Sequence, residues 1–233
     1  MVKIMAIVNL TPDSFFGPSR VVAGGVGDRL RHLVASGADI IDIGAVSTRP
    51  GAGPVPPDEE WRRLLPALEA WRGGAVLSVD TTRSEIVRKT CSKVGRFMVN
   101  DISAGEDDPG MLAAVAELGL PYVAMHKRGT PATMDSLTDY GESGVVGVVL
   151  DYFKEFSEKA DAAGIKDWIL DPGFGFAKTD AQNLELLHAL PVFKRFGRPI
   201  LVGLSHKRFT HGRTASLHLE AVLRGADILR MHI

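Results

Sequence analysis

Polar and charged side chains recur in this sequence at the ends of short apolar runs. The residues at such positions are Asn9, Asp42, Asp80, Asn100, Asp101, Met125, His126, Asp171, Ser205, Lys207, Arg230 and His232. Any single Asp or Asn there could simply form a turn. As a set they indicate a site, because Lys207 and Arg230 would be costly to bury unless they pair with carboxylates or with a ligand.

The mixture of residue types predicts a ligand with two chemically different parts. Carboxylates and an amide suit a planar heterocycle with a row of N–H donors, because a carboxylate accepts two parallel hydrogen bonds. Arg49, Lys207, Arg230 and His232 suit an anion such as a phosphate, to which Arg offers bidentate contacts and Lys a point charge. We therefore expect part of the ligand to be a heterocycle and part a phosphate.

A repeated unit of strand and helix must position these side chains. Eight runs rich in Val, Ile, Leu and Met are predicted strands, at residues 3–9, 39–44, 75–80, 97–101, 121–126, 168–171, 199–205 and 226–232. Predicted helices alternate with them, at residues 27–36, 58–71, 84–94, 109–118, 145–163, 180–190 and 214–224. The apolar runs are mostly continuous, which indicates a parallel sheet buried on both faces.

Such a repeat forms either a closed barrel or an open doubly wound sheet. No predicted strand is followed by G-x-G-x-x-G, and the helix-to-strand junctions at residues 36–39 (S-G-A-D) and 224–227 (R-G-A-D) are near copies. We predict an α/β fold, a (β/α)8 TIM barrel that forms a single domain over residues 1–233, with the eighth helix apparently absent. In such barrels the chemistry lies at the C-terminal ends of the strands, which brings the polar set to one mouth.

Local signals also predict where helices begin and end. Thr82 and Glu85 have the spacing of a capping box for the helix at 84–94, and Asp108 precedes Pro109 at the next helix start. Gly119 and Gly164 stand where helices should end.

Composition excludes several classes of protein. With 27 basic and 28 acidic side chains, the chain has no overall field that would attract nucleic acid. Cys91 is the only cysteine, so no intramolecular disulfide can form and we expect a cytoplasmic protein. The sequence contains no run of eighteen apolar residues, so no membrane span is predicted. The histidines form no H-E-x-x-H motif, and zinc is not predicted.

Several motifs together resemble the signatures of the dihydropteroate synthases, the folate-pathway enzymes that sulfonamides inhibit. The most specific are N-L-T-P-D-S-F at residues 9–15 and D-I-G-A-V-S-T-R-P-G at residues 42–51. Further matches at predicted strand ends are S-V-D-T (78–81), V-N-D-I-S-A-G (99–105), M-H (125–126), L-D-P-G-F-G-F (170–176), G-L-S-H-K (203–207) and R-M-H (230–232). The resemblance spans essentially the whole chain.

The resemblance implies a transferase that condenses 6-hydroxymethyl-7,8-dihydropterin diphosphate with p-aminobenzoate. Pyrophosphate would leave by a dissociative step, so no Ser or Cys nucleophile is needed. The resemblance also implies Mg²⁺ as a cofactor and a homodimer.

The roles of individual residues follow from the same resemblance. The pterin-binding residues would be Asp80, Asn100, Met125, Asp171, Phe176, Gly203, Lys207 and Arg230. The p-aminobenzoate site would contain Thr48, Arg49, Pro50 and Ser205, and the diphosphate site Asn9, Arg49, Arg230 and His232. Asn9 would bind the metal, and the catalytic residues would be Arg49, Lys207 and Arg230.

Two other functions stay open. A pterin-binding methyltransferase would share the barrel and its carboxylates, but it would move a methyl group to a corrinoid and would need no diphosphate site. A barrel could also bind pterin without catalysis. Arg49 and the Ser205-x-Lys207 motif favour the synthase over both.

Overall fold

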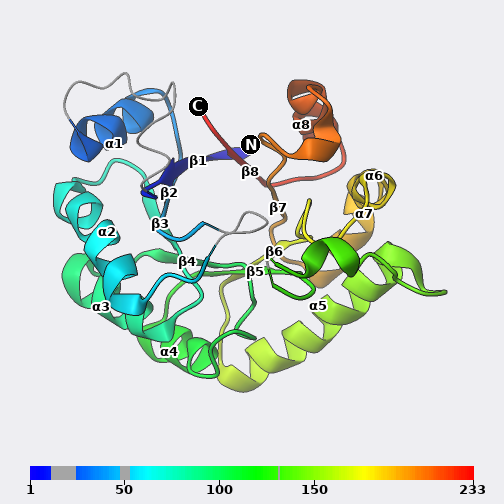
Figure 1. Cartoon of the computed structure of the whole chain (residues 1–233), viewed down its shortest axis with the longest axis horizontal. Coiled ribbons are helices and arrows are strands. Elements are labelled where there is room, and N and C mark those ends of the chain that lie inside the picture. The colour runs from blue at the N-terminus through cyan, green and yellow to red at the C-terminus, as the bar shows by residue number, and fades with distance from the viewer. Residues whose placement is uncertain (12–24, 48–52, 131) are drawn as a thin grey trace.

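The strands form one parallel sheet that curls into a nearly closed barrel (Figure 1). A computed structural model describes residues 1–11, 25–47, 53–130 and 132–233. The strands are β1 (Lys3–Asn9), β2 (Ile40–Gly44), β3 (Val76–Asp80), β4 (Met98–Asp101), β5 (Tyr122–Met125), β6 (Trp168–Asp171), β7 (Leu201–Val202) and β8 (Ile228–Met231). Their order is β6-β5-β4-β3-β2-β1-β8-β7, and a single bridge from Leu170 to Ile200 connects β6 with β7. The predicted TIM barrel is confirmed.

Helices surround the barrel (Figure 1). They are α1 (Val26–Ala35), α2 (Pro57–Ala70), α3 (Ser84–Val94), α4 (Met111–Leu118), α5 (Gly144–Ala163), α6 (Asp180–His188), α7 (Leu190–Phe193) and α8 (Thr214–Leu223). Short 3-10 helices lie at Met134–Ser136, Lys194–Phe196 and Arg208–Thr210. The stretch predicted as one helix at 180–190 is divided into α6 and α7. The helix α8 precedes β8.

The strands bury both of their faces, as their continuous apolar runs predicted. Outward-facing residues such as Ile41, Val79 and Val99 join the main core between sheet and helices. The inward-facing residues form a separate apolar layer inside the barrel, composed of Met5, Ile40, Met98, Val123, Ile169, Leu201 and Ile228. This layer makes the barrel interior a packed core rather than a pore.

The local capping predictions are partly wrong. No side chain caps α3 from its N-cap residue Arg83, so the predicted box of Thr82 and Glu85 does not form. Instead, Asp108 reaches across from the next βα unit and its Oδ2 accepts a hydrogen bond of 2.7 Å from the backbone N–H of Ser84. A tertiary contact thus replaces the local cap. Gly119 and Gly164 do end helices, both in the left-handed conformation.

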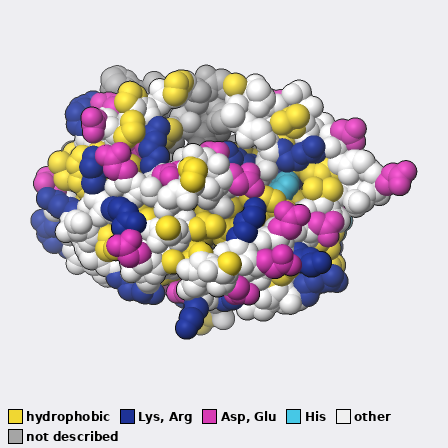
Figure 2. Space-filling view, turned by 90° about the horizontal axis from the view of Figure 1, so that it is seen from below, with side chains coloured by type: hydrophobic (Ala, Val, Ile, Leu, Met, Phe, Trp, Pro, Cys, Tyr) yellow, Lys and Arg dark blue, Asp and Glu magenta, His cyan; other side chains and the backbone are white. Residues whose placement is uncertain are grey.

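The exterior carries charges of both signs. In Figure 2 acidic and basic side chains are interspersed with apolar ones over the visible face, and neither sign dominates. No described helix is long and apolar enough to cross a membrane.

Candidate active site

The alternation of side chains along the strands places a polar layer directly on the apolar layer inside the barrel. Side chains two residues apart on a strand lie on the same face. Two residues after each member of the apolar layer come Ile7, Asp42, Asn100, Met125, Asp171, Gly203 and Arg230. Several of these residues are direct partners on neighbouring strands, since Ile7 pairs with Asp42 and Met125 pairs with Asp171. The carboxyl ends of the strands therefore bring acids, an amide and a guanidinium together above an apolar floor.

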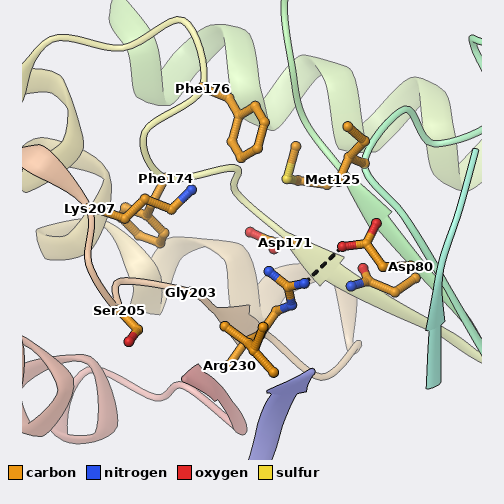
Figure 3. A pocket seen from close by; sticks show the side chains of 12 residues that line it. Asp80, Met125, Asp171, Phe174, Phe176, Gly203, Ser205, Lys207 and Arg230 are labelled. Carbon is orange, nitrogen blue, oxygen red and sulfur yellow. Dashed lines mark hydrogen bonds and ion pairs between the residues drawn. The ribbon is translucent and has the colours of Figure 1, made fainter. Parts of the chain in front are cut away.

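A pocket opens above this floor. It is lined by Ile7, Asp80, Asn100, Ile102, Met125, Asp171, Phe174, Phe176, Gly203, Ser205, Lys207 and Arg230. All the positions that the resemblance assigns to the pterin are among them. Ser205, which was predicted to bind the second substrate, lines the same pocket. Figure 3 shows Met125 and Phe176 on one side of this pocket and Arg230 pointing toward Asp80.

Arg230 is the electrostatic centre of the pocket. Its Nε donates to Asp42 Oδ2 at 2.7 Å and its Nη2 donates to Asp80 Oδ2 at 2.8 Å. Asp42 also accepts hydrogen bonds from Ser78 Oγ at 2.6 Å and from Asn100 Nδ2 at 3.0 Å. Burial works against the charge of Arg230, but Asp42 and Asp80 outweigh it and raise the pKa of Arg230 above its ordinary value.

Two acids in the pocket are harder to ionise than ordinary carboxyls. Burial, aided by the nearby Asp42, raises the pKa of Asp80 to about 7 although Arg230 opposes the shift. Burial also raises the pKa of Asp171, while a 2.8 Å hydrogen bond from the Gly173 N–H to Asp171 Oδ1 opposes it. Because such perturbed acids cluster at functional sites, they support a binding role for the pocket.

Lys207 is held over the aromatic wall. Its Nζ lies 4.4 Å from the centroid of the Phe176 ring, and its stem passes Gly175 so closely that a Cβ there would lie 2.9 Å from Lys207 Cδ. Gly175 also has a φ of +76°, which glycine adopts without strain. Burial and then Arg230 lower the pKa of Lys207 to about 8. Residues of the D-P-G-F-G-F motif thus pack against this lysine.

The remaining predicted residues lie at the mouth or outside the described part of the chain. Ser205 Oγ lies 3.0 Å from His232 Nδ1. This contact joins the segment after β7 to the segment after β8. Asn9 ends β1 and is partly exposed. Thr48, Arg49 and Pro50 lie outside the described residues. No group of three or more His, Cys, Asp or Glu side chains in the described ranges could hold a metal ion.

Comparison with known proteins identifies the family. The profile of the family described as "Pterin binding enzyme" matches residues 5–232. This chain therefore belongs to the pterin-binding enzyme family.

Several similar proteins are named dihydropteroate synthases. The dihydropteroate synthase of Synechocystis sp. is 40% identical over 98% of this chain and 84% of its own length. That of Escherichia coli strain K12 is 38% identical over 98% and 86%. The structure of the Xanthomonas albilineans dihydropteroate synthase with 4-aminobenzoic acid has a TM-score of 0.87 and 39% identity, covering 99% of this chain and 87% of that one. The Yersinia pestis enzyme in a sulfonamide drug complex has a TM-score of 0.90 and 33% identity, covering 100% and 89%.

Proposed function

We propose that this chain is a dihydropteroate synthase, a transferase of folate biosynthesis that joins 6-hydroxymethyl-7,8-dihydropterin diphosphate to p-aminobenzoate. The observation that carries the proposal is the pocket in which Asp80, Asn100 and Asp171 face Lys207 and Arg230 above an apolar floor. The family membership and the synthases among its relatives support it.

The pterin would occupy the pocket as a flat, donor-rich ring. Asp171 and Asp80 would accept hydrogen bonds from its N–H edge, with Asn100 beside them. Met125 and Phe176 would contact its faces, and Arg230 would lie against it as a cation. Burial raises the pKa values of both acids. A ligand that donates to them would therefore favour their ionised forms.

The reaction exchanges one bond for another at the methylene carbon outside the pterin ring. The C–O bond to the diphosphate breaks first, and pyrophosphate takes the electron pair. The electron-rich ring stabilises the resulting cation. The aniline nitrogen of p-aminobenzoate then forms the C–N bond and loses a proton. The protein's part is to orient the two reactants and to stabilise the departing anion, for which we propose Arg49, Lys207, Arg230 and His232.

Mg²⁺ is part of this proposal. Asn9 ends β1 at the mouth and offers a carboxamide oxygen, a hard ligand of the kind that Mg²⁺ accepts. A single protein ligand suits this ion, which keeps several waters and binds substrate phosphates directly. When bound, it would neutralise charge on the leaving diphosphate.

We place p-aminobenzoate at the outer end of the same pocket. Ser205 lines this pocket, and Thr48, Arg49 and Pro50 belong to the segment after β2. The carboxyl ends of parallel strands share one edge, so this segment starts from the same mouth.

We also propose a homodimer that forms through α8. Leu219 and Leu223 lie one helical turn apart on that helix and are 61% and 79% exposed. Two large apolar side chains on one exposed face of a helix would favour packing against the same face of a second copy of the chain. The cytoplasm is the proposed location, because Cys91 has no second cysteine to pair with.

Pyrophosphate release tests the proposed reaction. The chain is mixed with pterin diphosphate, p-aminobenzoate and Mg²⁺, and each component is omitted in turn. A synthase releases pyrophosphate over many turnovers only with all of them present, whereas a methyltransferase or a non-catalytic pterin-binding protein releases none. Asp171→Asn should lose most of the activity, and Asp151→Asn on the exposed side of α5 should keep it. Equal rates in these two variants would remove Asp171 from the site.

A further inference from the structure

Lys178 is a buried lysine that lies outside the pocket lining. The residue is 7% exposed and lies directly before the N-cap of α6. Its Nζ donates to the carbonyl oxygens of Gly173 and Phe176, at 2.9 Å each, and to His126 Nδ1 at 3.0 Å. No carboxylate in the described part of the chain forms an ion pair with it. Burial lowers the pKa of Lys178 to about 7, although Asp171 opposes the shift. Burying a lysine amine in this way costs stability, which indicates a role other than stabilising the fold.

The two carbonyls belong to a loop with an unusual backbone. Gly173, Gly175 and Ala177 have φ values of +73°, +76° and +52°. The left-handed conformation is unfavourable for Ala177, because it has a Cβ. Tyr140 OH donates to the Ala177 carbonyl at 3.0 Å, and Asn183 Oδ1 accepts from the Gly175 N–H at 2.7 Å. Lys178 adds hydrogen bonds to the carbonyls of Gly173 and Phe176, so the loop is held along its length.

The other side of this loop faces the pocket. Phe174 and Phe176 line it, and Gly175 and Phe176 are the residues that seat Lys207 (Figure 3). A change in the loop backbone would therefore move both an aromatic wall and a cation of the pocket. Lys178 is placed to control that backbone from behind.

His126 completes the arrangement. Side chains alternate along β5, so Met125 points into the pocket while His126 points outward to α5, where its ring meets Tyr152 edge-on at 4.9 Å between centroids. Burial, aided by Lys178, lowers the pKa of His126 to about 2. The imidazole is then neutral, and its Nδ1 accepts from Lys178 Nζ when the amine is protonated. The M-H motif thus supplies one residue to each side of the barrel wall.

We propose that Lys178 is a positioning residue, whose side-chain nitrogen holds the loop at residues 173–177 against His126 and thereby fixes Phe176 and Lys207 for pterin binding. This inference rests on the proposed function, because it takes pterin as the ligand of the pocket. Lys178 itself does not touch the ligand. Its contribution passes through the loop carbonyls and is separable from that of the residues lining the pocket.

The first test replaces the side-chain nitrogen while keeping the length of the side chain. Lys178→Met is compared with Lys127→Met, a matched change at a lysine whose side chain is 8% exposed and whose ion pair is with Asp107. Binding of a pterin without a diphosphate is measured by calorimetry, and folding by circular dichroism. We expect Lys178→Met to lose at least about tenfold in pterin affinity and Lys127→Met less than about twofold. A folded Lys178→Met variant with the affinity of the wild type would overturn the proposal.

The second test changes His126, the side-chain partner of Lys178, and applies even if Lys178→Met does not fold. In His126→Asn the amide oxygen can take the place of Nδ1, whereas His126→Leu offers no acceptor. The proposal predicts that pterin affinity falls several-fold in His126→Leu and stays within about threefold of the wild type in His126→Asn. Equal affinities of the two variants would contradict it. A wild-type chain that binds no pterin would instead refute the proposed function.

Discussion

Arg230→Met should destabilise the fold more than a change at a partly exposed residue usually does. The guanidinium holds Asp42, whose side chain is 0% exposed, and Asp80, whose side chain is 13% exposed. Breaking a buried ion pair by removing one partner costs about 3–5 kcal/mol, because the remaining charge stays buried. Asp42 keeps its hydrogen bonds from Ser78 and Asn100, so we expect the lower end, about 3 kcal/mol.

The pH dependence of this loss has a definite sign. With Arg230 present, burial already raises the pKa of Asp80 to about 7. Without the cation the pKa rises further. A carboxyl whose pKa is raised in the folded state lowers the free energy of unfolding as pH rises, until the pH passes that raised pKa. In the wild type this loss ends near pH 7, whereas in the variant it continues to higher pH. The destabilisation of Arg230→Met should therefore be larger at pH 8 than at pH 5.5.

Urea unfolding followed by circular dichroism measures both quantities. The double variant Asp42→Asn, Arg230→Met removes one of the two carboxylates left without a partner and should recover at least about 1 kcal/mol relative to Arg230→Met alone. An Arg230→Met variant within about 0.5 kcal/mol of the wild type at pH 8 would refute the electrostatic role given to this residue.

Four further predictions concern binding, metal, pH and assembly. Asp171→Asn should weaken binding of a non-reactive pterin by about 1.5–3 kcal/mol in calorimetry, because the amide turns a donor toward a donor; unchanged affinity would exclude the predicted contact. Asn9→Ala should raise the Mg²⁺ concentration for half-maximal turnover at least about threefold, and a chelator should abolish turnover in both proteins; an unchanged Mg²⁺ requirement would exclude Asn9 as a ligand. The pKa of His126 is lowered to about 2, so its contribution to stability is present above pH 6.5 and is lost as pH falls, by about 2 kcal/mol at pH 5. The stability of His126→Asn relative to the wild type should therefore improve by that amount between pH 7.5 and pH 5 in urea unfolding, and a constant difference would contradict the buried neutral ring. Changing both Leu219 and Leu223 to Glu should yield monomers in analytical ultracentrifugation where the wild type gives dimers, and dimers in both would move the interface away from α8.

The barrel and most of its pocket were predictable because they depend on short-range patterns. Each buried parallel strand leaves a continuous apolar run, and each run ends where the chain must turn, so strand ends such as Asp80 and Asp171 could be located from the sequence. The alternation along a strand then determines which side chains point inward. The same rule would have added Ile7, which lies two residues after Met5, to the predicted pocket.

Contacts between distant residues were not predictable in the same way. Asp42 was recognised as a strand-end acid, but its bond to Arg230 joins residues 188 positions apart and depends on the register of the closed barrel. The local pattern at Thr82 and Glu85 was misleading, because Asp108 reaches the same helix start from another unit. Lys178 gave no signal, since its role depends on a side chain that folds back under its own loop.

The most direct test of the central claim is the stoichiometry of the complete reaction. The purified chain is incubated with pterin diphosphate, p-aminobenzoate and Mg²⁺, and 7,8-dihydropteroate is quantified by mass spectrometry alongside pyrophosphate. The proposed function predicts one dihydropteroate for each pyrophosphate over many turnovers. Omitting p-aminobenzoate or Mg²⁺ should abolish dihydropteroate formation and sustained release of pyrophosphate. A chain that binds pterin tightly but forms no dihydropteroate would contradict it.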